Sequence, residues 1–307
     1  MSSKAGKAGF WRRLGGFLID GILLGLVGFA LGTALFDTLA RLPGPTRLIG
    51  LAVGVAYYGL LASGLGGGRT LGMRVVGAKV VGLDGRPLAL GASLWRALWL
   101  QGPLIVNGMM LTGLEPILMQ VWIVVAAALV FGVGVANLIL IFGNGHTGRL
   151  VHDLLSGAVV VRTENDAPPT GEKRGAVVFA ALAGVLVTAL AFGLSQKAMD
   201  KALPFAALLR IQTAVAALPG VLETSVVENT MFSFLGGEKR QSLIVNARVA
   251  TWPSDPQALA DRIGVAVRRS YALKPGETIK VVLRRGYDIG IAQGWTARSY
   301  EPRFSAS

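Results

Sequence analysis

The chain has 307 residues, of which 52% are hydrophobic and 15% are charged, and its mean hydropathy is +0.57. A soluble domain carries about 25% charged residues, so this composition excludes an ordinary soluble protein and predicts a membrane protein. The formal net charge of +13 would suggest nucleic-acid binding in a soluble chain. Here much of that charge flanks apolar segments, as the positive-inside rule describes, and we expect no nucleic-acid partner. The chain has no cysteine, which excludes disulfides and thiolate metal sites.

The first predicted span covers about residues 14–36 and follows a basic tail, which we place in the cytoplasm. Arg13 lies where the apolar run begins and Asp20 lies seven positions later, so both are on one helix face. Seven residues rise about 10 Å, which is too far for a direct ion pair. An aspartate inside a span costs about 2.5–3.5 kcal/mol on insertion scales. We therefore expect Asp20 to face protein or water, and to have another partner or be protonated.

Three further segments complete the N-terminal half. A second span covers about residues 48–65, and a basic stretch at 66–91 returns to the cytoplasm. Its valine-rich part and the Asp84-Gly85 turn signal predict a short amphipathic hairpin on the membrane surface. Residues 97–112 contain Gln101, Pro103 and Asn107 and either cross the membrane or re-enter it. The flanking charges favour crossing, and residues 119–142 form a clear span.

The C-terminal half is predicted to have a different organisation. Residues 163–174 read as a polar linker, 175–197 as a fifth transmembrane helix and 198–307 as a soluble α+β domain. That domain is expected to hold helices at about 203–217 and 255–271 and strands at about 221–228, 241–251 and 278–285. Its helix–Leu-Pro-Gly-Val–strand opening looks like small ferredoxin-like modules, and the stretch after Asp288 is expected to be irregular. With an odd number of spans, the domain faces the extracytoplasmic side.

Four blocks within residues 8–162 resemble the RDD family of prokaryotic membrane proteins, named for one arginine and two aspartates. They are F-W-R-R-L-x-x-x-L-I-D from residue 10, T-L-G-M-R-V-V-G from residue 70, the arginine Arg96 that begins the next helix, and L-V-H-D-L-L-S-G-A-V-V-V from residue 150. The resemblance implies a four-helix transmembrane unit over residues 1–162 and signature residues Arg13, Asp20 and Asp153. The chain departs from the family pattern at Gly15-Gly16, where alanine is frequent, and at Gly157-Ala158, where Gly-Thr is usual.

The resemblance brings a suggested transport role, including sodium/proton antiport for some members, and the residues leave two functions open. The first is a bacterial inner-membrane carrier of protons, monovalent cations or a small solute, with Asp20 as ligand, Arg13 and Asp153 at the cytoplasmic mouth and Arg96 as a charge partner. In a structural alternative, Asp20 forms a buried salt bridge with Arg96 or Arg74 that fixes helix registration. The second function is a non-catalytic anchor that presents residues 198–307 to envelope proteins.

The remaining candidate residues carry weaker signals. No nucleophile–base pair or metal-ligand spacing is present, so we expect no enzyme activity, metal or other cofactor. His146 and His152 are the only histidines, and His152 is a secondary candidate for proton sensing. Asn107 and Asn137 either hydrogen-bond between helices or line a polar path. Secondary candidates also include Gly72, Met73, Asp84 and Gly85. The bilayer is the expected partner, and a homo-oligomer is compatible with the sequence.

Overall fold

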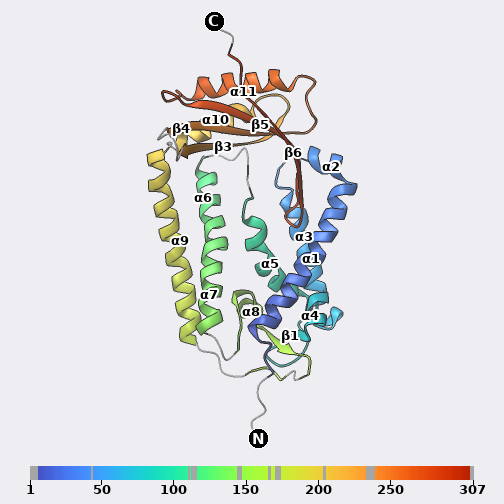
Figure 1. The fold of residues 1–307 in the computed structure, drawn as a ribbon. Helices are drawn as coiled ribbons and strands as arrows, with labels where there is room; N and C mark the ends of the chain where they lie inside the picture. Colours follow the sequence, from blue (N-terminus) through green and yellow to red (C-terminus); the bar gives the residue numbers. More distant parts are fainter. Residues whose placement is uncertain are drawn as a thin grey trace.

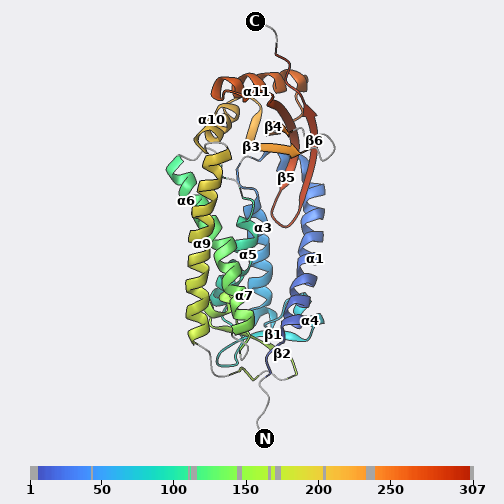
Figure 2. The same ribbon diagram turned by 60° about the vertical axis from the view of Figure 1, so that its left-hand side comes forward.

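The chain folds as an elongated helical bundle with an α+β domain on one end (Figure 1). The structure is a computed structural model that describes residues 6–42, 44–109, 111, 116–143, 147–164, 167–169, 174–202, 205–232 and 239–304. The chain begins at the end of the bundle opposite the domain, and we call that end the base (Figures 1 and 2).

Five helical segments run along the bundle. They are α1 (Phe10–Ala34), α3 (Arg47–Leu61), α5 (Leu90–Val106), the continuous run α6 (Pro116–Ala127), π-helical η2 (Ala128–Gly132) and α7 (Val133–Gly143), and α9 (Arg174–Ala202). Among the described residues, the stretches Phe10–Ala34, Val121–Gly143 and Gly175–Leu194 are long and apolar enough to cross a membrane. Large apolar side chains on their outward faces stay exposed, as a lipid-facing surface requires. Examples are Ile22, Phe29, Phe179, Leu182 and Val185.

The helices α3 and α5 are shorter, with 15 and 17 residues. Helix α5 begins at the base and α6 begins at the domain end (Figure 1), and residues 110 and 112 of the predicted 97–112 segment lie outside the described residues. The helix covers part of that distance and ends at Val106, three residues after the internal Pro103. The chain therefore passes from the base to the domain end between the start of α5 and the start of α6.

The base is built from two short helix–strand units. They are α4 (Leu71–Val75) with β1 (Ala78–Gly82) and α8 (Val151–Leu155) with β2 (Ala158–Arg162). The predicted hairpin within 66–91 is wrong, because β1 pairs antiparallel with the distant β2. The turn forms, with Gly85 at φ +78°, but the chain after it leads into α5. Burial of the valine side chains explains why β1 pairs with β2 rather than forming a surface hairpin. The buried valines of the pair are Val80, Val81, Val159, Val160 and Val161.

The order helix, helix, short helix, strand occurs twice in the N-terminal half. The first set is α1, α3, α4 and β1, and the second is α5, α6–α7, α8 and β2. Smaller elements complete this half, namely α2 (Phe36–Arg41) and the 3-10 turn η1 (Gly64–Gly66). The two sets meet through the β1–β2 pair, so the two short helices lie at the same end of the bundle (Figure 1).

The C-terminal domain is an α+β fold. Its elements are α10 (Phe205–Ala216), β3 (Val221–Phe232), β4 (Lys239–Val249), α11 (Pro256–Ser270), β5 (Thr278–Asp288) and β6 (Gln293–Tyr300). The sheet order is β3-β4-β5-β6, with β4 and β5 parallel and the outer pairs antiparallel. A ferredoxin-like fold is not confirmed, because a split βαβ unit would place a strand between the parallel pair. The expectation of irregular structure after Asp288 is wrong, since β6 forms there and pairs with β5.

The β5–β6 hairpin extends from the domain into the bundle between α1 and α3 (Figure 2). Glycines on the two helices leave room for it. A Cβ atom on Gly32 would lie 1.8 Å from the Tyr287 hydroxyl, and one on Gly50 would lie 1.9 Å from the Ile289 carbonyl oxygen. Tyr287 and Ile289 are buried. The domain is therefore joined to the bundle by interdigitated packing as well as by α9.

Candidate functional site

Both candidate aspartates are fully buried at the base, where each binds a short helix. Asp20 projects from α1 toward α4, and Asp153 lies on α8 itself. The first turn of a helix has backbone N–H groups without intrahelical partners, which a carboxylate can accept. The two residues do the same local task in the two helix–strand units, but their surroundings differ.

Asp20 is held by three neutral donors. Its Oδ1 accepts from the Tyr57 hydroxyl at 2.6 Å and from the Gly72 backbone N–H at 2.7 Å, and its Oδ2 accepts from the Thr70 hydroxyl at 2.6 Å. Gly72 allows this close approach, because a Cβ there would lie 2.1 Å from the carbonyl oxygen of Gly16. Thr70 is also the N-cap of α4, with its hydroxyl accepting from the Met73 N–H.

No basic side chain among the described residues bonds to Asp20. The two arginines considered as partners are used elsewhere: Arg96 pairs with Asp153, and Arg74 donates to the carbonyl of Gly66. The three neutral donors therefore occupy the positions around the carboxylate that a basic partner would otherwise take. The structural alternative of an Asp20–arginine registration pair is therefore absent from the described part of the chain.

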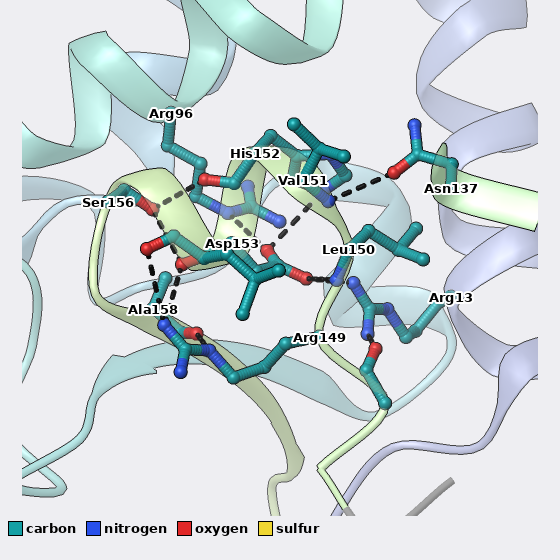
Figure 3. Close-up of polar contacts among 12 residues, drawn as sticks. Arg13, Arg96, Asn137, Arg149, Leu150, Val151, His152, Asp153, Ser156 and Ala158 are labelled. Carbon is teal, nitrogen blue, oxygen red and sulfur yellow. Dashed lines mark hydrogen bonds and ion pairs between the residues drawn. The ribbon is translucent and has the colours of Figure 1, made fainter. Parts of the chain in front are cut away.

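Asp153 sits in a buried charge cluster (Figure 3). Arg13 donates from Nη2 to its Oδ2, and Arg96 donates from Nε to its Oδ1 at 2.9 Å. The Leu150 N–H donates to Oδ2 at 3.2 Å, and His152 Nε2 lies 3.3 Å from Oδ1. The cluster joins α1, α5 and α8, so the Arg13 and Asp153 signature residues and Arg96 are brought together while Asp20 is not.

The charges of this cluster follow from its surroundings. Burial alone would raise the pKa of Asp153, but the guanidinium groups of Arg13 and Arg96 outweigh it and hold that pKa well below its usual range. Burial lowers the pKa of His152 to about 3, with the two arginines adding to the effect against the attraction of Asp153. At neutral pH the cluster therefore holds an ionised aspartate beside a neutral histidine.

Several functional contacts were missed by reasoning from the sequence. Arg149, 4% exposed, donates to the carbonyls of Ala158 at 2.8 Å and Asp153 at 3.1 Å, at the C-terminal end of α8. Its only signal in the sequence is a basic residue directly before the L-V-H-D block. Tyr57 gave no signal, because a tyrosine in an apolar run is common, and Thr70 was marked only as the first residue of the T-L-G-M-R-V-V-G block.

The other secondary candidates have varied positions. Asn137 accepts the Val151 N–H through its Oδ1 at 2.9 Å, which ties α7 to the start of α8 (Figure 3). Asp84 and Gly85 lie in the turn after β1, where Gly85 approaches Pro168, away from both aspartates. His146 lies outside the described residues. Within the described ranges, no group of three histidine, aspartate or glutamate side chains could hold a metal ion.

A cavity of about 460 Å³ lies inside the bundle between α1, α5 and the η2–α7 run. Its wall includes Asp20, Met73, Arg96, Asn107 and Asn137. The hydroxyl of Tyr58 and the Nε1 of Trp99 belong to the same wall and are buried without a hydrogen-bond partner among the described residues. The arrangement is an apolar cavity with a few polar groups, which is the usual composition of a small-molecule site.

Comparison with known proteins identifies the N-terminal half. A family model described as RDD family matches residues 7–157. No curated protein and no solved structure matches the chain.

Proposed function

The chain belongs to the RDD family of membrane proteins through residues 7–157, with a further C-terminal region, and from this premise we propose that it is a carrier in a bacterial inner membrane. In this proposal it moves protons or monovalent cations, alone or together with a small solute, and Asp20 is the intramembrane ligand. The observation that carries the proposal is a fully buried carboxylate at the wall of an internal cavity, bound only by neutral donors within the described residues.

A buried carboxylate within a membrane span, such as Asp20, costs free energy and so indicates a function. An ionisable residue within the membrane is by default a functional candidate, because burying its charge costs several kcal/mol, of order 2.5–3.5 on insertion scales. Registration of the helices is already supplied by Arg13, Arg96 and Asp153, which connect α1, α5 and α8. Asp20 also binds the start of α4, but no bond to it comes from a basic side chain among the described residues, so its carboxylate is the candidate ligand for a proton or a cation.

The donors around Asp20 suit a group that changes its charge. Hydroxyl groups rotate, so Tyr57 and Thr70 can donate to an ionised carboxylate and can accept from a protonated one. A hydroxyl oxygen can also coordinate a bound cation through its lone pairs. A fixed arginine partner would permit neither change, because it is a donor only.

In the proposed topology the base faces the cytoplasm and the C-terminal domain lies outside. The basic tail before α1 supports this orientation, and α3 and α5 serve as the remaining two of five spans. Arg13, Asp153 and Arg96 then shape the cytoplasmic mouth of the cavity.

The test is ion flux in vesicles reconstituted with the full chain. A pH gradient is imposed, and uptake of radioactive sodium and acidification of the lumen are measured for wild type, Asp20→Asn and Asp84→Asn. Asp84 is a matched control, because it is an exposed aspartate at the same end of the bundle. The carrier predicts flux in wild type and Asp84→Asn and none in Asp20→Asn. Equal flux in Asp20→Asn would contradict the role of Asp20.

A scaffold is the second candidate function, and the β5–β6 hairpin favours it. A domain held by packing between α1 and α3 is fixed relative to the membrane, as a docking platform for envelope proteins would need. The scaffold predicts no flux of any solute in wild type. It also predicts that an envelope protein co-purifies with wild type, and that this binding is lost when exposed residues of the C-terminal domain are substituted.

A further inference from the structure

We propose that the internal cavity binds a single-chain amphiphile that carries an oxyanion head group, of which a long-chain carboxylate is the simplest example. The inference names a ligand class for the cavity at Asp20 and so rests on the proposed function for its transport. Binding itself is carried by four observations: unsatisfied donors, the balance of charge, the apolar wall and the size of the cavity.

The first observation is a set of hydrogen-bond donors that lack a partner. Arg96 lines the cavity, is 2% exposed, and makes its one described hydrogen bond through Nε, so its two terminal nitrogens bond to no described residue. The Tyr58 hydroxyl and the Trp99 Nε1 are also unpartnered within the described residues, and Tyr58 is 2% exposed. A buried donor left without an acceptor costs about 1–3 kcal/mol, so an acceptor group supplied by a ligand would be favourable.

The second observation is the charge of the wall. Lys7, Arg13, Arg96 and Asp20 line the cavity, and Asp153 behind the wall pairs with both arginines, so the three cations face two carboxylates and one positive charge is in excess. The oxygens of Asp20 already accept three hydrogen bonds. A guanidinium group and two neutral donors suit a carboxylate or phosphate oxygen, because such bonds are shorter and stronger than those between neutral groups.

The third observation is that the rest of the wall is apolar. Beyond Arg96, α5 presents Leu100 and Leu104 to the cavity, and η2 and α7 present Val130, Val133 and Ile141. Leu104 is half exposed, so the apolar wall continues onto the outer surface of the bundle. A ligand dissolved in the bilayer could enter there, with its chain along α5 and its head toward the base. This is the orientation that a lipid with its head at the membrane surface already has.

The fourth observation is size. A cavity of about 460 Å³ is within the range of about 300–1,000 Å³ typical of sites for small organic ligands. That volume suits one chain better than a two-chain phospholipid. The opposite class, an ammonium amphiphile held by Asp20, is the main competitor and is separated by the experiment.

The test measures binding without transport. Full-length protein in a neutral maltoside detergent is titrated with palmitate, hexadecyl phosphate, hexadecanol or hexadecyltrimethylammonium, and occupancy is followed by native mass spectrometry. Palmitate or hexadecyl phosphate should bind at least about tenfold more tightly than hexadecanol, which has the same chain without the charge. Whichever of the two anions binds more tightly identifies the head group. Tighter binding of the ammonium amphiphile would overturn the proposal.

Variants test the two ends of the site. Replacing Arg96 also breaks its ion pair with Asp153, so Tyr58→Phe is the better test of the head group, because the lost hydroxyl has no described protein partner. One hydrogen bond predicts a loss of about two- to tenfold in affinity. Gly134 lines the cavity, and a Cβ there meets open space, so Gly134→Leu should fill the site and abolish binding.

Gly102→Leu is the matched control, because this helical glycine also has open space beside it but does not line the cavity. Its binding should equal that of wild type, and unchanged binding in Gly134→Leu would contradict the proposed place of the chain. Binding without flux would contradict the carrier and keep this site. Flux without binding of any anionic amphiphile would contradict this site and leave the carrier intact.

Discussion

Arg13 and Asp153 are 140 positions apart in the chain and form a buried ion pair at the base of the bundle. The pair joins the start of α1 to α8, and Arg96 adds α5 to the same carboxylate. The first arginine and the last aspartate of the family signature thus form one structural unit, whereas Asp20 stands apart with neutral partners.

This unit should be important for stability. Asp153→Asn leaves the buried guanidinium group of Arg96 and the partly buried one of Arg13 without their counter-charge, and breaking a buried pair costs about 3–5 kcal/mol. We expect a large fall in the thermal unfolding midpoint of the protein in detergent. Asp84→Asn, at an exposed turn, should change it little. An unfolding midpoint in Asp153→Asn equal to that of the control would show that the pair does not hold the base together.

The pH dependence of stability should come from His152. Its pKa in the folded protein is about 3, below the value of about 6.5 for an exposed histidine, so the unfolded chain binds the extra proton first as the pH falls. The stability that the neutral histidine contributes is complete above about pH 6.5 and is lost as the pH falls toward 3. The slope between pH 6 and 4 should be at most about 1.4 kcal/mol per pH unit.

Asp153 should add to that slope only near pH 4, because its pKa is lowered in the folded protein and its contribution is lost as the pH falls through the ordinary carboxylate pKa of about 3.9. Unfolding of wild type and His152→Asn is measured at pH 7, 6, 5 and 4. The variant should lose most of the slope over this interval. An unchanged slope would mean that His152 has the same pKa in the folded and the unfolded protein.

The hydroxyl of Thr70 should stabilise α4. It donates to Asp20 and accepts from the Met73 N–H, so Thr70→Val removes a donor from a buried carboxylate and the cap of a helix. The expected loss is about 1–3 kcal/mol in the free energy of unfolding. Thr70→Ser retains the hydroxyl and should lose much less. A loss in Thr70→Val no larger than that in Thr70→Ser would contradict the role of the hydroxyl.

The insertion of the hairpin can be tested by cross-linking, because the chain has no cysteine of its own. A Cβ atom on Gly28 would lie 2.9 Å from the Cβ of Ala292, so a small outward shift of the hairpin tip brings the two atoms to the separation of about 3.5–4.5 Å found in disulfides. The double variant Gly28→Cys and Ala292→Cys should cross-link on mild oxidation. Gly21 is one control position, since nothing lies within 4 Å of its added Cβ. Equal cross-linking of Gly21→Cys with Ala292→Cys would place the hairpin elsewhere.

The local sequence pattern was enough to predict the long helices and the first strand but not which strands pair with each other. The apolar runs predicted the three long helices, and the Asp255-Pro256 start signal predicted α11, which begins at Pro256 with Asp255 capping it. The valine-rich stretch was correctly expected to be a strand, but its partner β2 lies far along the chain. A turn signal at Asp84-Gly85 indicates where the chain bends and not which strand will pair.

The candidate site shows the same limit. A sequence reveals that Asp20 is inside an apolar run, but its donors come from α3 and from the start of α4 and depend on packing at Gly16 and Gly72. The β5–β6 hairpin was missed for a related reason. Its tip packs against the glycines of α1 and α3 rather than forming a regular amphipathic strand, so no period of two marks it.

The most direct test of the proposed role of Asp20 compares cation-driven proton movement in vesicles that contain equal amounts of wild type or Asp20→Asn. The carrier proposal predicts proton movement that depends on sodium or potassium in the first and only the background of empty vesicles in the second. Proton movement of equal rate in both would contradict Asp20 as the intramembrane ligand.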